Sequence, residues 1–94
     1  MKTLKELFYE LVSEGFGSNP VLIERGDYQG EKAALQEFEV HRTLISAISS
    51  YGKYSDKYKV DRYYKCCIGI NGKYTDKVGI KIKIISQFDK IKIQ

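Results

Sequence analysis

Between Val78 and Ser86 the chain alternates isoleucine with lysine, in the stretch VGIKIKIIS. Successive side chains of a β-strand point to opposite faces of a sheet, so this segment predicts a strand with one apolar row and one cationic row. The apolar row consists of Val78, Ile80, Ile82 and Ile84. A second layer must cover these side chains, and this requirement limits the chain to layered folds.

The segment TLKELFYELVSEG predicts an amphipathic helix that supplies part of this layer. Thr3 and Glu6 form a capping-box pair at its start, and Gly15 is a residue typical of a helix end. Its apolar stripe consists of Leu4, Leu7, Phe8, Leu11 and Val12.

A short strand is predicted over residues 21–25, closed by a turn at 26–30 with the sequence GDYQG. The following residues, 31–51, fit a strand poorly because Arg42 and Ser46 would interrupt its apolar row. At helical spacing the apolar residues instead fall within about half of the circumference, and Gly52 follows. We therefore expect a second helix over residues 31–51.

The rest of the chain is predicted to be β-structure. Residues 57–70 are expected to form a strand whose inward-facing side chains are Tyr58, Val60, Tyr64, Cys66, Ile68 and Ile70. An Asn71-Gly72 hairpin turn would place this row opposite the lysines of the next strand, so we expect a loop of about five to seven residues within 71–77. That loop would pair Ile68 with Val78 or Ile80. Ile91 and Ile93 indicate a last strand.

These elements predict one α+β domain spanning residues 1–94, in the order α-β-α-β-β-β. Both helices are expected to pack on one face of a mainly antiparallel sheet, as a two-layer sandwich. The lysine row would then lie on the face that the helices leave open.

Composition narrows the cellular setting. The chain has no apolar run long enough for a membrane span or a signal peptide, which predicts a cytoplasmic protein without membrane contact. Cys66 and Cys67 are adjacent and diverge in an extended segment, so we expect them to be reduced. With His41 as the only histidine they do not form a zinc-binding set, and neither a metal nor a cofactor is predicted.

Charge is distributed unevenly along the chain. Residues 1–50 carry five basic and eight acidic side chains, whereas residues 51–94 carry eleven basic and four acidic ones. Six of the eight tyrosines also lie in the basic half. Such asymmetry indicates a polyanionic partner, which we expect to be nucleic acid or a nucleoprotein.

The candidate binding surface is the lysine-rich face of the sheet. Lysines neutralise phosphates and an aromatic ring stacks on an unpaired base, so both residue types are typical of nucleic-acid platforms. The predicted residues are Lys57, Lys59, Tyr63, Lys65, Lys81 and Lys83 on the strands, with Lys53, Tyr54, Lys73 and Tyr74 in loops. The competing interpretation is a solvated face whose lysines prevent sheets from pairing edge to edge.

The loop residues belong to two similar segments of the sequence, GKYSDKY at 52–58 and GKYTDKV at 72–78. We interpret it as a common local turn, and the alternative is a duplicated binding loop. The intervening strand would separate the two copies by about 40 Å at ~3.3 Å per residue.

Catalysis has one candidate pair, Glu37 and His41, which would share a face of the predicted second helix. A buried carboxylate can orient an imidazole as a general base, but the sequence shows no nucleophile beside the pair. We therefore expect a non-catalytic binding module.

The alternative function is a phage- or plasmid-type accessory protein that acts through protein–protein interaction, such as an inhibitor of a host defence system. Its partner would be a host protein docked on the acidic helices or on a strand edge. The C-terminal KIKIQ could also add a strand to a partner or to a second copy, which would give a homodimer.

Overall fold

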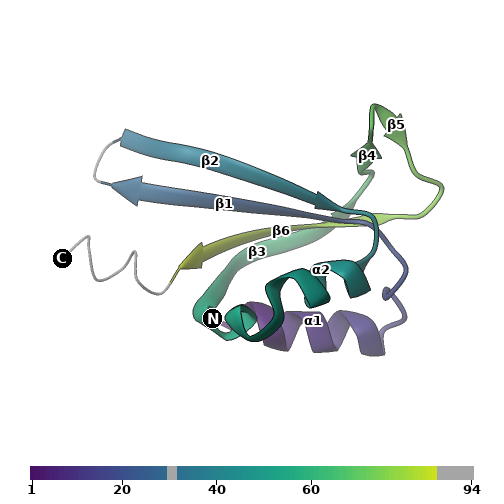
Figure 1. Cartoon of the computed structure of the whole chain (residues 1–94), viewed down its shortest axis with the longest axis horizontal. Coiled ribbons are helices and arrows are strands. Elements are labelled where there is room, and N and C mark those ends of the chain that lie inside the picture. The colour runs from purple at the N-terminus through teal and green to yellow at the C-terminus, as the bar shows by residue number, and fades with distance from the viewer. Residues whose placement is uncertain (30–31, 87–94) are drawn as a thin grey trace.

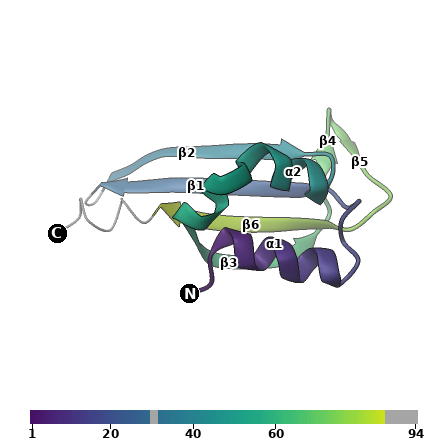
Figure 2. The same ribbon diagram turned by 60° about the horizontal axis from the view of Figure 1, so that its bottom comes forward.

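The computed structural model of the chain describes residues 1–29 and 32–86. Within them, two α-helices cover one face of a four-stranded, mostly antiparallel sheet, so the fold is the expected α+β arrangement (Figures 1 and 2). The predicted last strand falls in 87–94, outside the described residues. Neither described helix is long and apolar enough to cross a membrane.

The first helix, α1 (Leu4–Ser13), has the predicted ends. The Thr3 hydroxyl accepts a hydrogen bond from the Glu6 amide, and the Glu6 carboxylate accepts one from the Thr3 amide. Gly15 follows with a φ of 94°, a conformation that glycine adopts without steric cost. The capping box is therefore confirmed. Of the predicted apolar stripe, Leu4, Leu7, Phe8 and Leu11 are buried, but Val12 is exposed and lies outside the buried stripe.

The second helix is shorter than expected, and the prediction of a helix over 31–51 was wrong for its first part. Strand β1 (Val21–Gln29) continues through the predicted turn and pairs antiparallel with strand β2 (Lys32–His41). Helix α2 (Leu44–Tyr51) begins after the cap residue Thr43, whose hydroxyl accepts a hydrogen bond from the Ser46 amide. A 3-10 helix, η1 (Gly52–Lys57), continues from α2.

The four-stranded sheet has the order β2-β1-β6-β3. Strand β3 (Tyr58–Cys66) and strand β6 (Gly79–Ser86) are antiparallel, and β6 lies parallel to β1 at the centre. The isoleucines of the predicted apolar row are confirmed, because Ile80, Ile82 and Ile84 are fully buried beneath the helices. Val78 was wrongly included in this row, since it precedes β6 and is exposed.

The register between β3 and β6 differs from the prediction. Val60 lies opposite Ile84, so both face the helices as expected, although the predicted pairing would have placed residue 86 or 88 opposite Val60. Asp61 is an extra residue in a bulge, and Arg62 then lies opposite Lys83. From Arg62 onward the inward and outward positions of β3 are exchanged, so Tyr64 and Cys66 do not face the helices as predicted. A single inserted residue has this effect because side chains alternate with a period of two.

The predicted long loop was also wrong. Residues 69–70 (β4) and 73–74 (β5) form a small separate hairpin, with Asn71 and Gly72 as its turn. Both turn residues have positive φ, 53° and 79°, as a two-residue hairpin turn requires. Ile68 therefore pairs with neither Val78 nor Ile80, and the hairpin stands at the end of the sheet where β1 begins (Figure 1).

Candidate functional site

The sheet face opposite the helices carries two rows of side chains that run across all four strands. The register places one row in the order Val40, Leu22, Lys81, Tyr64 and the next row in the order Phe38, Glu24, Lys83, Arg62. Neither described helix covers these rows (Figure 2). We call these eight residues the open face.

The open face differs in chemistry from one side to the other. Its β2 and β1 side is mainly apolar, since Phe38 and Val40 are 54% and 47% exposed and lie beside Leu22. Its β6 and β3 side carries Lys81, Lys83 and Arg62. Glu24 of β1 is the one carboxylate among the eight.

Contacts within the face hold the cationic side in place. The Lys81 ammonium lies 3.9 Å from a Glu24 carboxylate oxygen and 5.8 Å from the centre of the Tyr64 ring. Hydrogen bonding to Tyr64 and the electrostatic attraction of the same side chain, with a smaller contribution from the charge of Glu24, raise the pKa of Lys81 above its ordinary 10.5. This lysine therefore stays charged throughout the physiological range.

Two predicted binding residues, Tyr63 and Lys65, do not lie on the open face. The bulge at Asp61 pairs them with Ile82 and Ile80, on the side of the helices. There the Lys2 ammonium lies 5.8 Å from the Tyr63 ring, and the Lys65 ammonium lies 4.6 Å from the Phe16 ring. Their predicted grouping with Lys81 and Lys83 was therefore wrong.

The other predicted strand residues lie nearer the expected place. Lys59 is opposite Ile85 and so shares the side of Lys81 and Lys83, at the outer strand. Hydrogen bonds from Thr3 are the main cause of the lowered pKa of Glu6, and the charge of Lys59 contributes to it. Lys59 therefore lies on the outer strand β3, at the margin of the open face and close enough to α1 to act on Glu6. Lys57 is the last residue of η1 and precedes the strand.

The loop residues lie at opposite ends of β3. Lys53 and Tyr54 belong to η1, where the lysine ammonium is 5.8 Å from the tyrosine ring. Lys73 and Tyr74 form β5 in the small hairpin, and Tyr74 is 79% exposed. The similar segments 52–58 and 72–78 therefore adopt different structures, a 3-10 helix and a short strand followed by a bend. This contradicts their interpretation as one common turn.

The Glu37–His41 pair does not exist as predicted, because both positions lie on a strand. Four residues along a strand span about 13 Å, compared with about 6 Å along a helix. His41 instead lies near Glu39, with 3.5 Å between His41 Nε2 and a carboxylate oxygen. Glu39 also accepts a hydrogen bond of 3.0 Å from the Tyr51 hydroxyl.

This polar group belongs to the packing between helices and sheet. The Tyr51 ring forms T-shaped contacts with the rings of Phe8 and Tyr58, and the Tyr58 hydroxyl accepts a hydrogen bond from Arg25. Three hollows whose lining lies in the described part of the chain include neither His41 nor Glu39.

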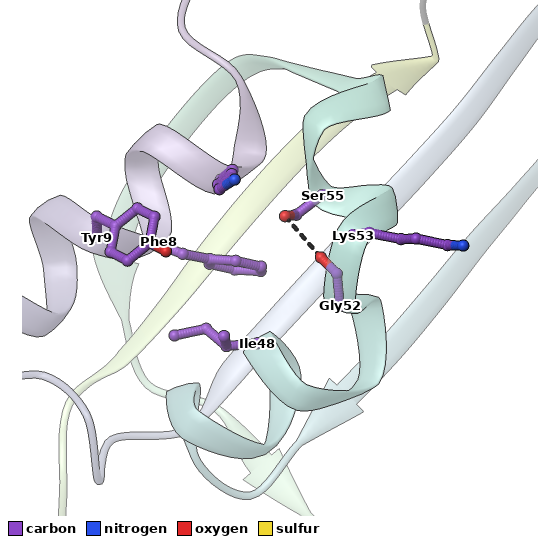
Figure 3. Close-up of a pocket in the computed structure, with 7 residues that line it drawn as sticks. Phe8, Tyr9, Ile48, Gly52, Lys53 and Ser55 are labelled. Atoms are coloured by element: carbon purple, nitrogen blue, oxygen red, sulfur yellow. Dashed lines mark hydrogen bonds between the residues drawn. The ribbon is translucent and has the colours of Figure 1, made fainter.

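The hollow between α1 and the α2–η1 segment has a volume of about 300 Å³. Phe8 and Ile48 extend into it from opposite sides, while the Lys53 side chain points away (Figure 3). The Ser55 hydroxyl donates a hydrogen bond to the Gly52 carbonyl, so its proton is already engaged (Figure 3). This hollow is apolar and does not bring reactive groups together.

Among the described residues, no cluster of three or more histidine, cysteine or acidic side chains could hold a metal ion. Cys66 and Cys67 are both free thiols, the first half-buried and the second exposed. No family model, curated protein or solved structure compared with the chain matches it.

Sequence reasoning missed six members of the open face. Arg62 and Tyr64 were placed in the inward row because nothing in the sequence marks the bulge at Asp61. Phe38 and Val40 were missed because the helix was extended over β2, and Leu22 and Glu24 lie on the predicted strand over residues 21–25 but were not assigned to a face. A usable signal was Thr43, a strong helix-capping residue, which marks the start of a shorter helix and frees the preceding residues to form a strand.

Proposed function

We propose that the protein is a small non-catalytic module that binds nucleic acid or a nucleoprotein through the open face. The carrying observation is that Lys81, Lys83 and Arg62 lie side by side on a sheet surface that neither described helix covers. Lysine and arginine on a flat surface neutralise phosphates and release counterions, which drives association. Arg62 adds a planar group suited to phosphate oxygens.

The rest of the surface supports this assignment. Glu6 and Glu10 of helix α1 and the C-cap residue Glu14 are exposed, and these carboxylates make the surface of that helix less favourable to a polyanion. A polyanion would therefore approach the sheet from the side of Lys81 and Lys83. The free thiols of Cys66 and Cys67 fit a reducing compartment, and we infer that the protein works in the cytoplasm.

The test is binding of fluorescein-labelled oligonucleotides, followed by anisotropy as the salt concentration is raised. Three phosphate contacts predict a slope of about −2 for the logarithm of the association constant against the logarithm of salt concentration on a single strand. The double variant Lys81→Gln/Lys83→Gln should remove most of the binding. Glutamine is preferred to glutamate because a second carboxylate beside Glu24 would itself disturb the sheet.

The matched control is Lys2→Gln/Lys5→Gln, on the helical side of the molecule, where the two ammonium groups lie beside Glu10 and Asp56. Both double variants lower the net charge from +4 to +2, so a loss of binding confined to Lys81 and Lys83 reports on position and not on total charge. Binding that is equal in both variants, or absent in the wild-type protein at low salt, would refute the proposed function.

A second candidate is a protein partner that adds a strand to β2, favoured by the state of the two sheet edges. At the β3 edge the Val60 amide donates to the Lys2 carbonyl and Thr3 pairs with Lys59, so described residues already occupy the first part of this edge. β2 is the other outer strand and exposes Phe38 and Val40. Val40→Lys should abolish capture of such a partner from a nuclease-treated host lysate, whereas Lys81→Gln/Lys83→Gln, on an inner strand, should leave that capture intact.

A further inference from the structure

The two sides of the open face suit two different parts of one ligand. The register places Phe38 two strands away from Lys83 in the same row, a lateral distance of about 10 Å at ~4.8 Å per strand. Val40 and Lys81 have the same relation in the neighbouring row. An apolar strip therefore runs parallel to a cationic strip over the described part of the face.

Resting on the proposed function, we propose that the ligand is single-stranded nucleic acid, with unpaired bases on the apolar strip and phosphates on the cationic strip. Bases stack on aromatic rings without regard to sequence, and Phe38 offers a ring that is 54% exposed. Tyr64, 48% exposed, offers a second ring among the cations.

A duplex fits the same surface poorly. Its bases are stacked inside, so the sheet would meet only sugars and phosphates. Phosphates placed over Phe38, Val40 and Leu22 would lose water without gaining a hydrogen-bond donor from these side chains. A single strand can turn its bases toward the apolar strip while its backbone follows Lys81, Lys83 and Arg62.

Glu24 helps to separate the two strips. Its side chain is only 13% exposed and lies between Phe38 and Lys83 in the row, near the Lys81 ammonium. A carboxylate in this place repels phosphates from the apolar strip and leaves neutral bases unaffected. The backbone of the ligand is thus directed to one side of the face.

The experiment compares a labelled single-stranded 12-mer with a hairpin duplex of the same composition at one salt concentration, and adds heparin as a polyanion without bases. The wild-type protein should bind the single strand about tenfold or more tightly than the duplex. Phe38→Ala should weaken single-strand binding about tenfold, as expected for loss of one stacked base, while leaving heparin binding unchanged.

Tyr9→Ala is the matched control, since Tyr9 is 68% exposed on α1 and lies on the other side of the molecule. It should leave all three affinities unchanged. Phe38→Leu keeps an apolar side chain in case the alanine variant does not fold, and it too should lose stacking on the single strand.

Each outcome decides between the assignments. Equal affinity for single strand and duplex, with no effect of Phe38→Ala, would overturn this inference and leave the proposed function standing. Absence of salt-dependent binding to all three ligands would overturn both. Binding of an acidic peptide with apolar residues, without oligonucleotide binding, would assign the open face to a protein partner and overturn the inference.

Discussion

The hydroxyl of Tyr51 shows how one side chain connects the helical layer to the sheet. Tyr51 is the last residue of α2, its ring packs between Phe8 and Tyr58, and its hydroxyl donates to Glu39 on β2. Burial, and then the charge of Glu39 and the hydrogen bond to it, raise the pKa of Tyr51 well above its ordinary 10.0. The contribution of this hydrogen bond to the free energy of unfolding therefore depends on pH.

Tyr51→Phe should lower the free energy of unfolding by about 1–2 kcal/mol at pH 7, because a hydrogen bond to a carboxylate is lost. The folded protein holds the Tyr51 proton more tightly than the unfolded chain, whose pKa is near 10. The stabilisation is thus complete below pH 10 and is lost as the pH rises toward the folded pKa. Urea unfolding at pH 7 and pH 10.5 should show the two proteins converging at the higher pH, and a constant difference would contradict this account.

Gly79 marks a second position where a single atom matters. A β-carbon at this residue would lie 2.3 Å from Ile68 Cδ1 and 2.9 Å from Ile68 Cβ, closer than atoms can approach. Gly79→Ala should therefore destabilise the protein by about 1–3 kcal/mol. In the double variant with Ile68→Ala the two effects should not add, because the two closest contacts, with Ile68 Cδ1 and Cγ1, are removed. Strict additivity in urea unfolding would refute the contact.

At the scale of elements, the sequence predicted those parts of the fold whose signals are local. The capping box of α1 and the isoleucine row of β6 follow from neighbouring residues, and both are confirmed. The identity of β2 depends on its pairing with β1, which supplies hydrogen bonds that a propensity argument over residues 31–51 does not see. The pairing with β1, and not the helical spacing of its apolar residues, therefore determines that residues 32–41 form a strand.

The candidate site was predicted in part for the same reason. Lys81 and Lys83 lie on the open side as expected, because alternation along one strand is a local property. Tyr63 and Lys65 were assigned to the wrong face because the face of each later side chain on β3 depends on how many residues separate it from Val60. The bulge at Asp61 adds one to that count and has no signature in the sequence.

The bulge predicts an asymmetry between two deletions in β3. Removing Asp61 would let Arg62 follow Val60 as a regular strand residue, with every pair from Arg62 to Cys66 unchanged. Removing Tyr64 would shift the later residues by one position and exchange their faces. We expect Asp61 deletion to change the free energy of unfolding by no more than about 1 kcal/mol, and Tyr64 deletion to cost at least about 3 kcal/mol.

Urea denaturation measures both deletions under the same conditions. Oligonucleotide binding adds a second readout, since Asp61 deletion leaves Arg62 beside Lys83. Equal destabilisation by the two deletions would show that Asp61 does more than occupy the bulge.

At the scale of the whole molecule, one core joins the two layers. The buried cluster combines Leu4, Leu7 and Leu11 of α1 with Ile80, Ile82 and other residues of the sheet. A chain of 94 residues has a total stability of roughly 5–14 kcal/mol, a small difference between large opposing terms. Neither layer can then be expected to persist without the other, and the open face depends on helices that lie on the opposite side of the sheet.

Leu7→Ala tests this dependence. Leu7 is fully buried, so its truncation should lower the free energy of unfolding by about 2–5 kcal/mol. Val12→Ala is the control on the same helix, because Val12 is 38% exposed and its truncation leaves no enclosed cavity. In the Leu7 variant, circular dichroism, tyrosine fluorescence and oligonucleotide binding should all report unfolding at the same urea midpoint. This midpoint should be lower than that of the control variant. A sheet that outlasts the helices, still binding its ligand after the helical signal has gone, would show that the open face is stable on its own.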